Sequence, residues 1–107
     1  MKKLVNKPLT YAIKEPDPSF MKMIDKEKKS SYFEIILEMC ERPANLQTGF
    51  SYSEIKTIDR IRTALHGKDE AEIEESDFEY LKPRIENWGW STPNIQFVQL
   101  TDYIKSL

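Results

Sequence analysis

The sequence is poor in the residues that form disulfides, metal centres and membrane spans. Its 107 residues include one cysteine and one histidine. No apolar run approaches the roughly 20 residues that a helix needs to cross a bilayer. A single Cys40 cannot form an internal disulfide, which favours a reducing compartment, and its apolar neighbours predict that it fills the core. His66 has no second histidine and no adjacent cysteine, so the sequence predicts no metal site.

The N-terminus also lacks the apolar segment of a secretory signal. We therefore expect the chain to stay in the compartment where it is made and to have no membrane partner. Catalysis would need a nucleophile beside a base, or other convergent polar groups. One cysteine, one histidine and carboxylates at positions predicted to face solvent supply no such pair. The sequence thus predicts a protein that is not an enzyme and has no cofactor.

Charge is present in quantity but is unevenly distributed. Charged residues make up 32% of the chain and apolar residues 39%, which is typical of one globular domain with a modest core. The net charge is −2, yet residues 1–30 hold eight lysines and four acidic residues, whereas residues 69–79 hold seven acidic residues and no basic one. This polarity either orients the chain on a partner or on a copy of itself, or is solvated surface.

Three segments have the pattern of a helix N-terminus. Ser31-x-x-Glu34, Ser51-x-x-Glu54 and Ser76-x-x-Glu79 each precede an apolar periodic run. In a capping box, the serine hydroxyl accepts a hydrogen bond from the amide three residues on, and the glutamate reaches back to the serine amide. The sequence therefore predicts that helices begin at these three serines.

Apolar spacing extends this pattern along the chain. Gly67 suits a left-handed cap after the helix that begins at Ser51. Pro83 predicts a kink or break in the helix that begins at Ser76. Asp17-Pro18 resembles a helix start leading into Met23 and Ile24, and Thr92-Pro93 resembles another. The predicted helices thus comprise a short one from residue 17, then residues 31–42, 51–66, 76–88 and 93 to the end, with residues 68–75 as an acidic linker.

The first residues differ from the rest. Leu9, Tyr11 and Ile13 alternate with more polar residues in a strand pattern, and the nearby prolines exclude a helix. A lone strand must lie over the helices, pair with a second strand that the sequence does not reveal, or add to a partner's sheet. We therefore expect a mainly α fold, a compact bundle of four to five short helices, with residues 1–16 as an extended arm and residues 17–107 as a single helical domain.

Part of the chain resembles a known kind of protein. From Ile58 onward, the layout resembles small uncharacterised helical open reading frames of tailed phages and prophages. The matching residues are Ala64-Leu65-His66-Gly67-Lys68, Glu74 to Lys82, Ile85, Pro93 and Ile95. The resemblance covers about half of the chain and implies a virus or mobile element as the setting. It implies the cytoplasm of a bacterial host, or the virion, as the location.

The interpretation that the sequence favours is a protein-interaction module that acts as a virion or assembly component. An extended arm, opposed charges and aromatic residues near a helix break suit docking on a protein partner or self-assembly, since Trp and Tyr are enriched at interface centres. Core packing is the alternative role for both tryptophans, and we favour it for Trp88. The candidate partner-binding residues are Leu9, Tyr11, Ile13, Tyr80 and Trp90.

Two other functions remain open at this stage. The first is an adaptor or inhibitor that binds a host protein. The second is a DNA-binding helical protein that uses Lys56, Arg60 and Arg62 with the basic arm. Acidic residues share that helix surface, and the pI is about 5.5 rather than above 9. Nucleic acid is therefore a partner that the sequence allows but does not favour.

Overall fold

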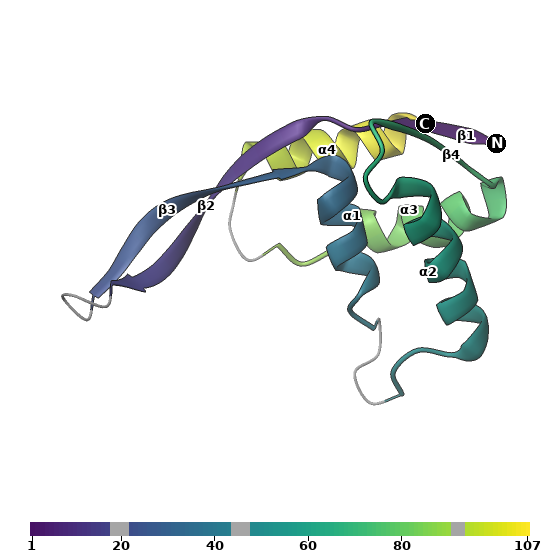
Figure 1. The fold of residues 1–107 in the computed structure, drawn as a ribbon, viewed down its shortest axis with the longest axis horizontal. Coiled ribbons are helices and arrows are strands. Elements are labelled where there is room, and N and C mark those ends of the chain that lie inside the picture. The colour runs from purple at the N-terminus through teal and green to yellow at the C-terminus, as the bar shows by residue number, and fades with distance from the viewer. Residues whose placement is uncertain (18–21, 44–47, 91–93) are drawn as a thin grey trace.

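The structure is a computed structural model that describes residues 1–17, 22–43, 48–90 and 94–107, with side chains described outside residues 12–25. The molecule measures 49 × 32 × 23 Å, with the helices gathered at one end and a long hairpin projecting from them (Figure 1). In chain order, the elements are β1 (Lys2–Val5), β2 (Pro8–Asp17), β3 (Lys22–Ser31), α1 (Tyr32–Cys40), α2 (Tyr52–Leu65), β4 (Glu70–Ile73), α3 (Glu75–Glu86) and α4 (Ile95–Ser106).

The predicted fold class is wrong: the protein is a mixed α/β globule and not a mainly α bundle. Its described residues form two small antiparallel sheets, β1 with β4 and β2 with β3, besides the helices. The error lies in two segments. The first is residues 22–31, which were expected to end a short helix but instead form β3. The second is residues 68–75, which were expected to be a linker but contain β4.

Strand β4 shows why a short acidic segment can be structural. Its Ala71 and Ile73 are buried, and they alternate with two exposed glutamates. Ala71 lies opposite Leu4 of β1, which is fully buried. On the solvent side, Nζ of Lys3 lies 3.3 Å from a carboxylate oxygen of Glu70. The period of two residues is that of a half-buried strand, and it ties the N-terminus of the chain into the core.

Strands β2 and β3 form a continuous ladder without a register shift, from Pro8 opposite Ser31 to Asp17 opposite Lys22. This is one of the three arrangements that the sequence left open, a pairing with an unrecognised strand. The ladder includes the segment after Asp17-Pro18 that was expected to be helical; residues 18–21 lie outside the described residues. A lysine-rich run without an apolar helical face gains more from pairing with β2 than from helix formation.

The prolines of β2 fit the ladder because of where their nitrogens point. The Thr10 amide donates a hydrogen bond to Oε1 of Gln96 at 2.7 Å, so it points away from β3. In an antiparallel pair, this orientation recurs at every second residue. Pro8 and Pro16 share the parity of Thr10, and therefore their missing N–H groups remove no bond to β3.

Helix starts follow the predicted caps at two of three places. The Ser31 hydroxyl accepts a hydrogen bond from the Glu34 amide at 3.3 Å, and Ser51 with Glu54 forms the complete capping box. The start predicted at Ser76 is wrong, because α3 begins at Glu75 with Glu74 as its cap residue. Since β4 ends at Ile73, the chain enters the helix before it reaches the serine.

The structure also shows how α2 ends, whether α3 continues through its proline and where α4 starts. Gly67 has φ of +69°, as its role in a left-handed cap requires. Helix α3 continues through Pro83, so the helix does not break there. Helix α4 starts after Asn94, whose side chain accepts a hydrogen bond from the Gln96 amide at 2.8 Å. The start predicted at Thr92-Pro93 lies outside the described residues.

One hydrophobic core joins helices and strands. The predicted boundary after residue 16 falls inside β2, and the described side chains before it include the buried Leu4 and Leu9. Apolar residues of the helices supply much of the rest, whereas Ile55 of α2 is 53% exposed. The helical part of this core comprises Tyr32, Phe33, Ile35, Ile36, Met39, Cys40, Ile58, Ile61, Leu65, Phe78, Leu81, Ile85, Phe97, Leu100 and Ile104.

Candidate protein-interaction site

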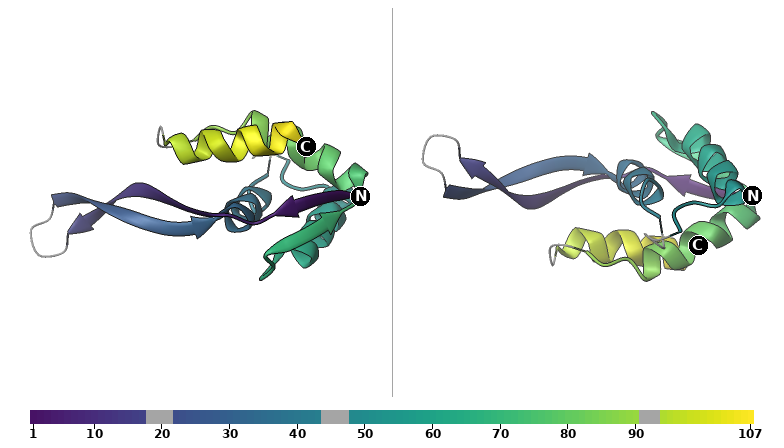
Figure 2. Two further views of the ribbon diagram at one scale, coloured as in Figure 1. Left: turned by 90° about the horizontal axis from the view of Figure 1, so that it is seen from above. Right: turned by 90° about the horizontal axis from the view of Figure 1, so that it is seen from below.

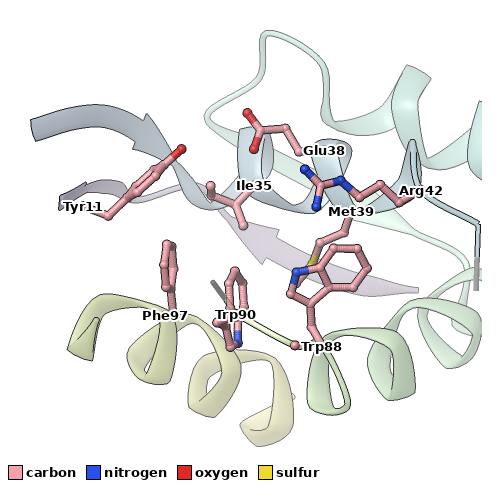
Figure 3. A pocket seen from close by; sticks show the side chains of 9 residues that line it. Tyr11, Ile35, Glu38, Met39, Arg42, Trp88, Trp90 and Phe97 are labelled. Carbon is pink, nitrogen blue, oxygen red and sulfur yellow. The ribbon is translucent and has the colours of Figure 1, made fainter. Parts of the chain in front are cut away.

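Aromatic side chains gather where the hairpin leaves the helical body. The rings of Trp90 and Phe97 are stacked, with centroids 4.2 Å apart and planes inclined by 8°. The Tyr11 ring packs against Phe97 at 5.2 Å with an inclination of 50°. Figure 3 shows Tyr11 on β2 above Phe97 on α4, with Trp90 beside it. Three distant segments of the chain therefore build one aromatic cluster.

Local structure positions each ring. Helix α3 ends at Glu86, a turn follows at Asn87, and Trp90 lies in the irregular segment after it. Helix α4 is fixed against β2 by Gln96, whose Nε2 donates to Oγ1 of Thr10 at 3.2 Å while its Oε1 accepts from the Thr10 amide. This attachment sets Phe97, the next residue on the helix, beside the strand that carries Tyr11.

The cluster lines a pocket of about 140 Å³. Pockets for cofactors and small molecules usually measure about 300–1,000 Å³, so this one suits a single side chain. Arg42 approaches the ring of Trp88 at 6.0 Å, and Glu38 lies 4.0 Å from Nζ of Lys28, so charges flank the aromatic wall. The lining residues are Tyr11, Ile35, Glu38, Met39, Arg42, Trp88, Gly89, Trp90 and Phe97.

The structure brings together two of the five predicted partner-binding residues, Tyr11 and Trp90. Leu9 is 3% exposed and belongs to the core. Ile13 has its backbone in β2 opposite Lys26, and its side chain lies outside the described residues. Tyr80 is not among the residues that line this pocket.

Tyr80 takes part in a polar network between helices. Its hydroxyl donates to Oε2 of Glu54 at 3.2 Å and accepts from Nη1 of Arg84 at 3.1 Å. Arg84 also donates to the backbone carbonyls of Met39 and Arg42 at the end of α1. Burial raises the pKa of the Tyr80 hydroxyl; the charge of Arg84 opposes this rise and that of Glu54 adds to it. The network holds α1, α2 and α3 together.

Sequence reasoning missed several residues of the pocket. Trp88 was favoured as core, and Phe97, Glu38 and Arg42 were not singled out as candidate site residues. The available signal was a pair of tryptophans, Trp88 and Trp90, that follow a helix end and are separated by one glycine. This pattern indicates two large rings close together outside regular structure.

Arg60 and Arg62 of α2 face carboxylates on neighbouring elements, whereas Nζ of Lys56 lies 4.8 Å from the centre of the Tyr52 ring on the same helix. Arg60 makes a forked interaction with Asp77, with Nη2 to Oδ1 at 2.8 Å and Nε to Oδ2 at 3.1 Å. An Nη of Arg62 lies 3.9 Å from a carboxylate oxygen of Glu41. These partners offset the positive charge that a nucleic-acid surface would need.

Within residues 1–17, 22–43, 48–90 and 94–107, no group of three or more His, Cys, Asp and Glu residues could hold a metal ion. Cys40 is 1% exposed, and burial raises the pKa of its thiol to about 11, which disfavours the reactive thiolate. The helices in the described part of the chain are all too short or too polar to span a bilayer.

Comparisons with protein-family models, with curated proteins and with solved structures give no match for this chain.

Proposed function

We propose that this chain is a small protein-interaction module that docks through its β2–β3 hairpin and the aromatic pocket at the base of that hairpin. Its setting, by the resemblance of its C-terminal half, is a tailed phage or prophage. In that setting the module serves assembly of the virion, or acts as an adaptor or inhibitor on a host protein.

The observation that carries this proposal is the projection of the hairpin beyond the helical body. Both strands are ten residues long, and their outer parts extend away from the helices in every view (Figure 2). A two-stranded ribbon is marginal by itself, because each strand has neighbours on one side only. A partner that binds along the ribbon would supply the missing contacts and stabilise it.

The pocket supports the same proposal. It is small, and three of its rings come from Tyr11, Trp88 and Trp90, each of which is partly exposed. Aromatic pockets of this kind receive anchor side chains at protein interfaces. Its place at the root of the hairpin gives a partner two contacts, one along the ribbon and one at its base.

Nucleic-acid binding has less support. The hairpin between Pro8 and Ser31 contains five lysines and four acidic residues, and its net charge is therefore only +1. Phosphate binding depends on several uncompensated positive charges. Arg60 and Arg62 of α2 both face carboxylates on neighbouring elements.

A hairpin-shortening experiment tests the proposal. Replacement of residues 14–25 by Asn-Gly joins Ile13 to Lys26, a hydrogen-bonded pair by the parity of Thr10, with the two-residue turn that suits such pairs. The shortened chain keeps the core residues of β2 and should melt with native cooperativity. A photo-crosslinking residue at position 27 of the full-length chain should capture a discrete protein from a bacterial lysate, and one at exposed position 72 should not.

Retention of that captured protein by the full-length chain and its loss from the shortened chain would support docking through the hairpin. Equal retention by both chains would contradict it. Light scattering on the purified protein separates the settings, because self-assembly gives a larger species and an adaptor remains a monomer.

A further inference from the structure

The two outer edges of the hairpin differ in the backbone groups that they present. On β2, Pro8 and Pro16 have no N–H, and the outward groups of Thr10 are bonded to α4. The Thr10 amide donates to Gln96, and its carbonyl accepts from Nδ2 of Asn94 at 3.5 Å. Most of the outward positions of β2 are therefore blocked against a further strand.

The outer edge of β3 has no such protection. Because the register is unbroken, the residues opposite Thr10 and Ala12 also point their backbone groups outward; these are Lys29 and Glu27. Neither is a proline. In the described part of the chain, no backbone hydrogen bond joins either residue to a segment outside the hairpin. Both residues are exposed.

We propose that the outer edge of β3 binds an extended segment of a partner protein with acidic residues at alternate positions, which adds a third strand to the hairpin. This inference rests on the proposed interaction function and names the chemistry of the partner. Strand addition derives affinity from main-chain hydrogen bonds and specificity from alternate side chains.

The preference for acidic residues follows from Lys26 and Lys28. These lysines lie opposite Ile13 and Tyr11, and their backbone groups point toward β2. Relative to an added strand they form the pairs without hydrogen bonds, in which opposite side chains come closest. An Asp or Glu facing each of them, two residues apart on the partner, gives the favourable cross-strand charge.

Lysines on the strands already form ion pairs with carboxylates on neighbouring elements, one from β3 to α1 and one diagonally from β1 to β4. Nζ of Lys28 already lies 4.0 Å from Oε1 of Glu38, and both side chains are about half exposed. On the other sheet, β4 carries glutamates at alternate positions and pairs with β1, where Lys3 meets Glu70 at 3.3 Å. The fold thus contains an acidic alternating strand beside a lysine-bearing one.

A second copy of this chain fits the same edge poorly. A two-fold antiparallel pairing places one residue opposite itself at the symmetry axis. Residues 26, 27 and 28 are all charged, so an axis at any of them sets like charges against each other. An axis at Glu27 also sets Lys26 opposite Lys28. Like charges directly opposite are destabilising, which disfavours a second copy paired about these residues and favours a different chain.

The probe is an acetylated, amidated peptide of alternating Thr and Glu, added to the ¹⁵N-labelled full chain. On saturation, hydrogen exchange should slow by about tenfold or more at the amides of Glu27 and Lys29. The amides of Lys26 and Lys28, which already face β2, should change much less. A peptide with Lys in place of Glu should not bind, and one with the same composition but consecutive glutamates should bind more weakly.

Two matched variants isolate the edge. Glu27→Pro removes an outward N–H of β3 and should abolish peptide binding. Ala12→Pro removes the outward N–H of the residue directly opposite on β2 and should leave binding unchanged. Thermal melting of both variants verifies that the fold is retained. Any variant that unfolds is replaced by N-methylation of the same amide in a semisynthetic chain.

Equal loss of binding in the two variants, or equal affinity for the acidic and basic peptides, would overturn this inference. So would a wild-type dimer that Glu27→Pro converts to a monomer, because a second copy would then occupy the edge. If the hairpin captures a protein in the shortening experiment but the acidic peptide does not bind, the interaction function stands and the acidic-strand inference fails.

Discussion

Arg60 on α2 and Asp77 on α3 form an ion pair in which the carboxylate is buried and the guanidinium is half exposed. The side chain of Asp77 is 5% exposed, whereas that of Arg60 is 50% exposed. The pair therefore anchors a buried carboxylate from the solvent side and joins two helices that are separated by β4. Although Arg60 is half exposed, its loss should be costly because it would leave the buried carboxylate of Asp77 without a partner of opposite charge.

Substitution of Arg60 tests that dependence. Arg60→Ala should lower the urea midpoint clearly, and Arg60→Lys should restore it only in part because an ammonium group lacks the planar fork of arginine. The matched control is Arg62→Ala on the same helix, whose contact with Glu41 is solvent-exposed; it should change stability by no more than about 0.5 kcal/mol. Similar midpoints for the two alanine variants would contradict the structural role.

Two serines test the helix starts. Ser51→Ala removes the hydroxyl of a complete capping box and should destabilise the protein by about 1 kcal/mol. Ser76→Ala falls inside the first turn of α3 and should alter stability by less than about 0.5 kcal/mol. Chemical denaturation of both variants under the same conditions measures the difference. A larger loss of stability for Ser76→Ala than for Ser51→Ala would contradict the start of α3 at Glu75.

The buried N-terminal strand gives a third prediction. Leu4 is fully buried, so Leu4→Ala should cost about 2–5 kcal/mol, a large part of the stability of a domain of this size. Lys3→Ala, at the adjacent exposed position, should change stability by about 0.5 kcal/mol or less. Differential scanning calorimetry compares the two. Wild-type melting of Leu4→Ala would show that β1 is dispensable.

Cys40 makes the stability depend on pH in the alkaline range. Burial raises the pKa of its thiol from 9.0 to about 11. Below pH 9 the thiol is protonated in both states, and its contribution is fully present. As pH rises from 9 to 11, the unfolded chain loses the proton first, so about 2–3 kcal/mol of stability is lost. Urea titrations of the wild type and Cys40→Ala should diverge over this window, and parallel curves would contradict the burial effect.

Local signals explain which helices the sequence predicted well. Helices α1 and α2 follow serine caps and carry apolar stripes, and both properties are encoded within a few residues. Ser76 shows the limit of the same rule. Its pattern is as good as that of Ser51, but β4 delivers the chain to α3 two residues earlier, which only the tertiary structure determines.

The strands were harder to predict because their partners are distant. Strand β4 has only two buried positions, Ala71 and Ile73, and its glutamates make it look like a linker. Strand β3 has no continuous alternation of apolar and polar residues, so its structure depends on pairing with β2. In the candidate site, Tyr11 and Trp90 stood out individually, but Phe97, which joins them, could be recognised only after α4 was placed beside β2.

The prolines of β2 also limit how far any assembly can grow. A ribbon with two open edges would accept a strand on each side and could propagate into a filament. Here Pro8, Pro16 and the bonds from α4 to Thr10 block most outward positions of β2, so a strand adds at β3 in preference to β2. The two edges of the hairpin are therefore unequal, and the β2 edge disfavours the bridging of two partner strands that fibre growth requires.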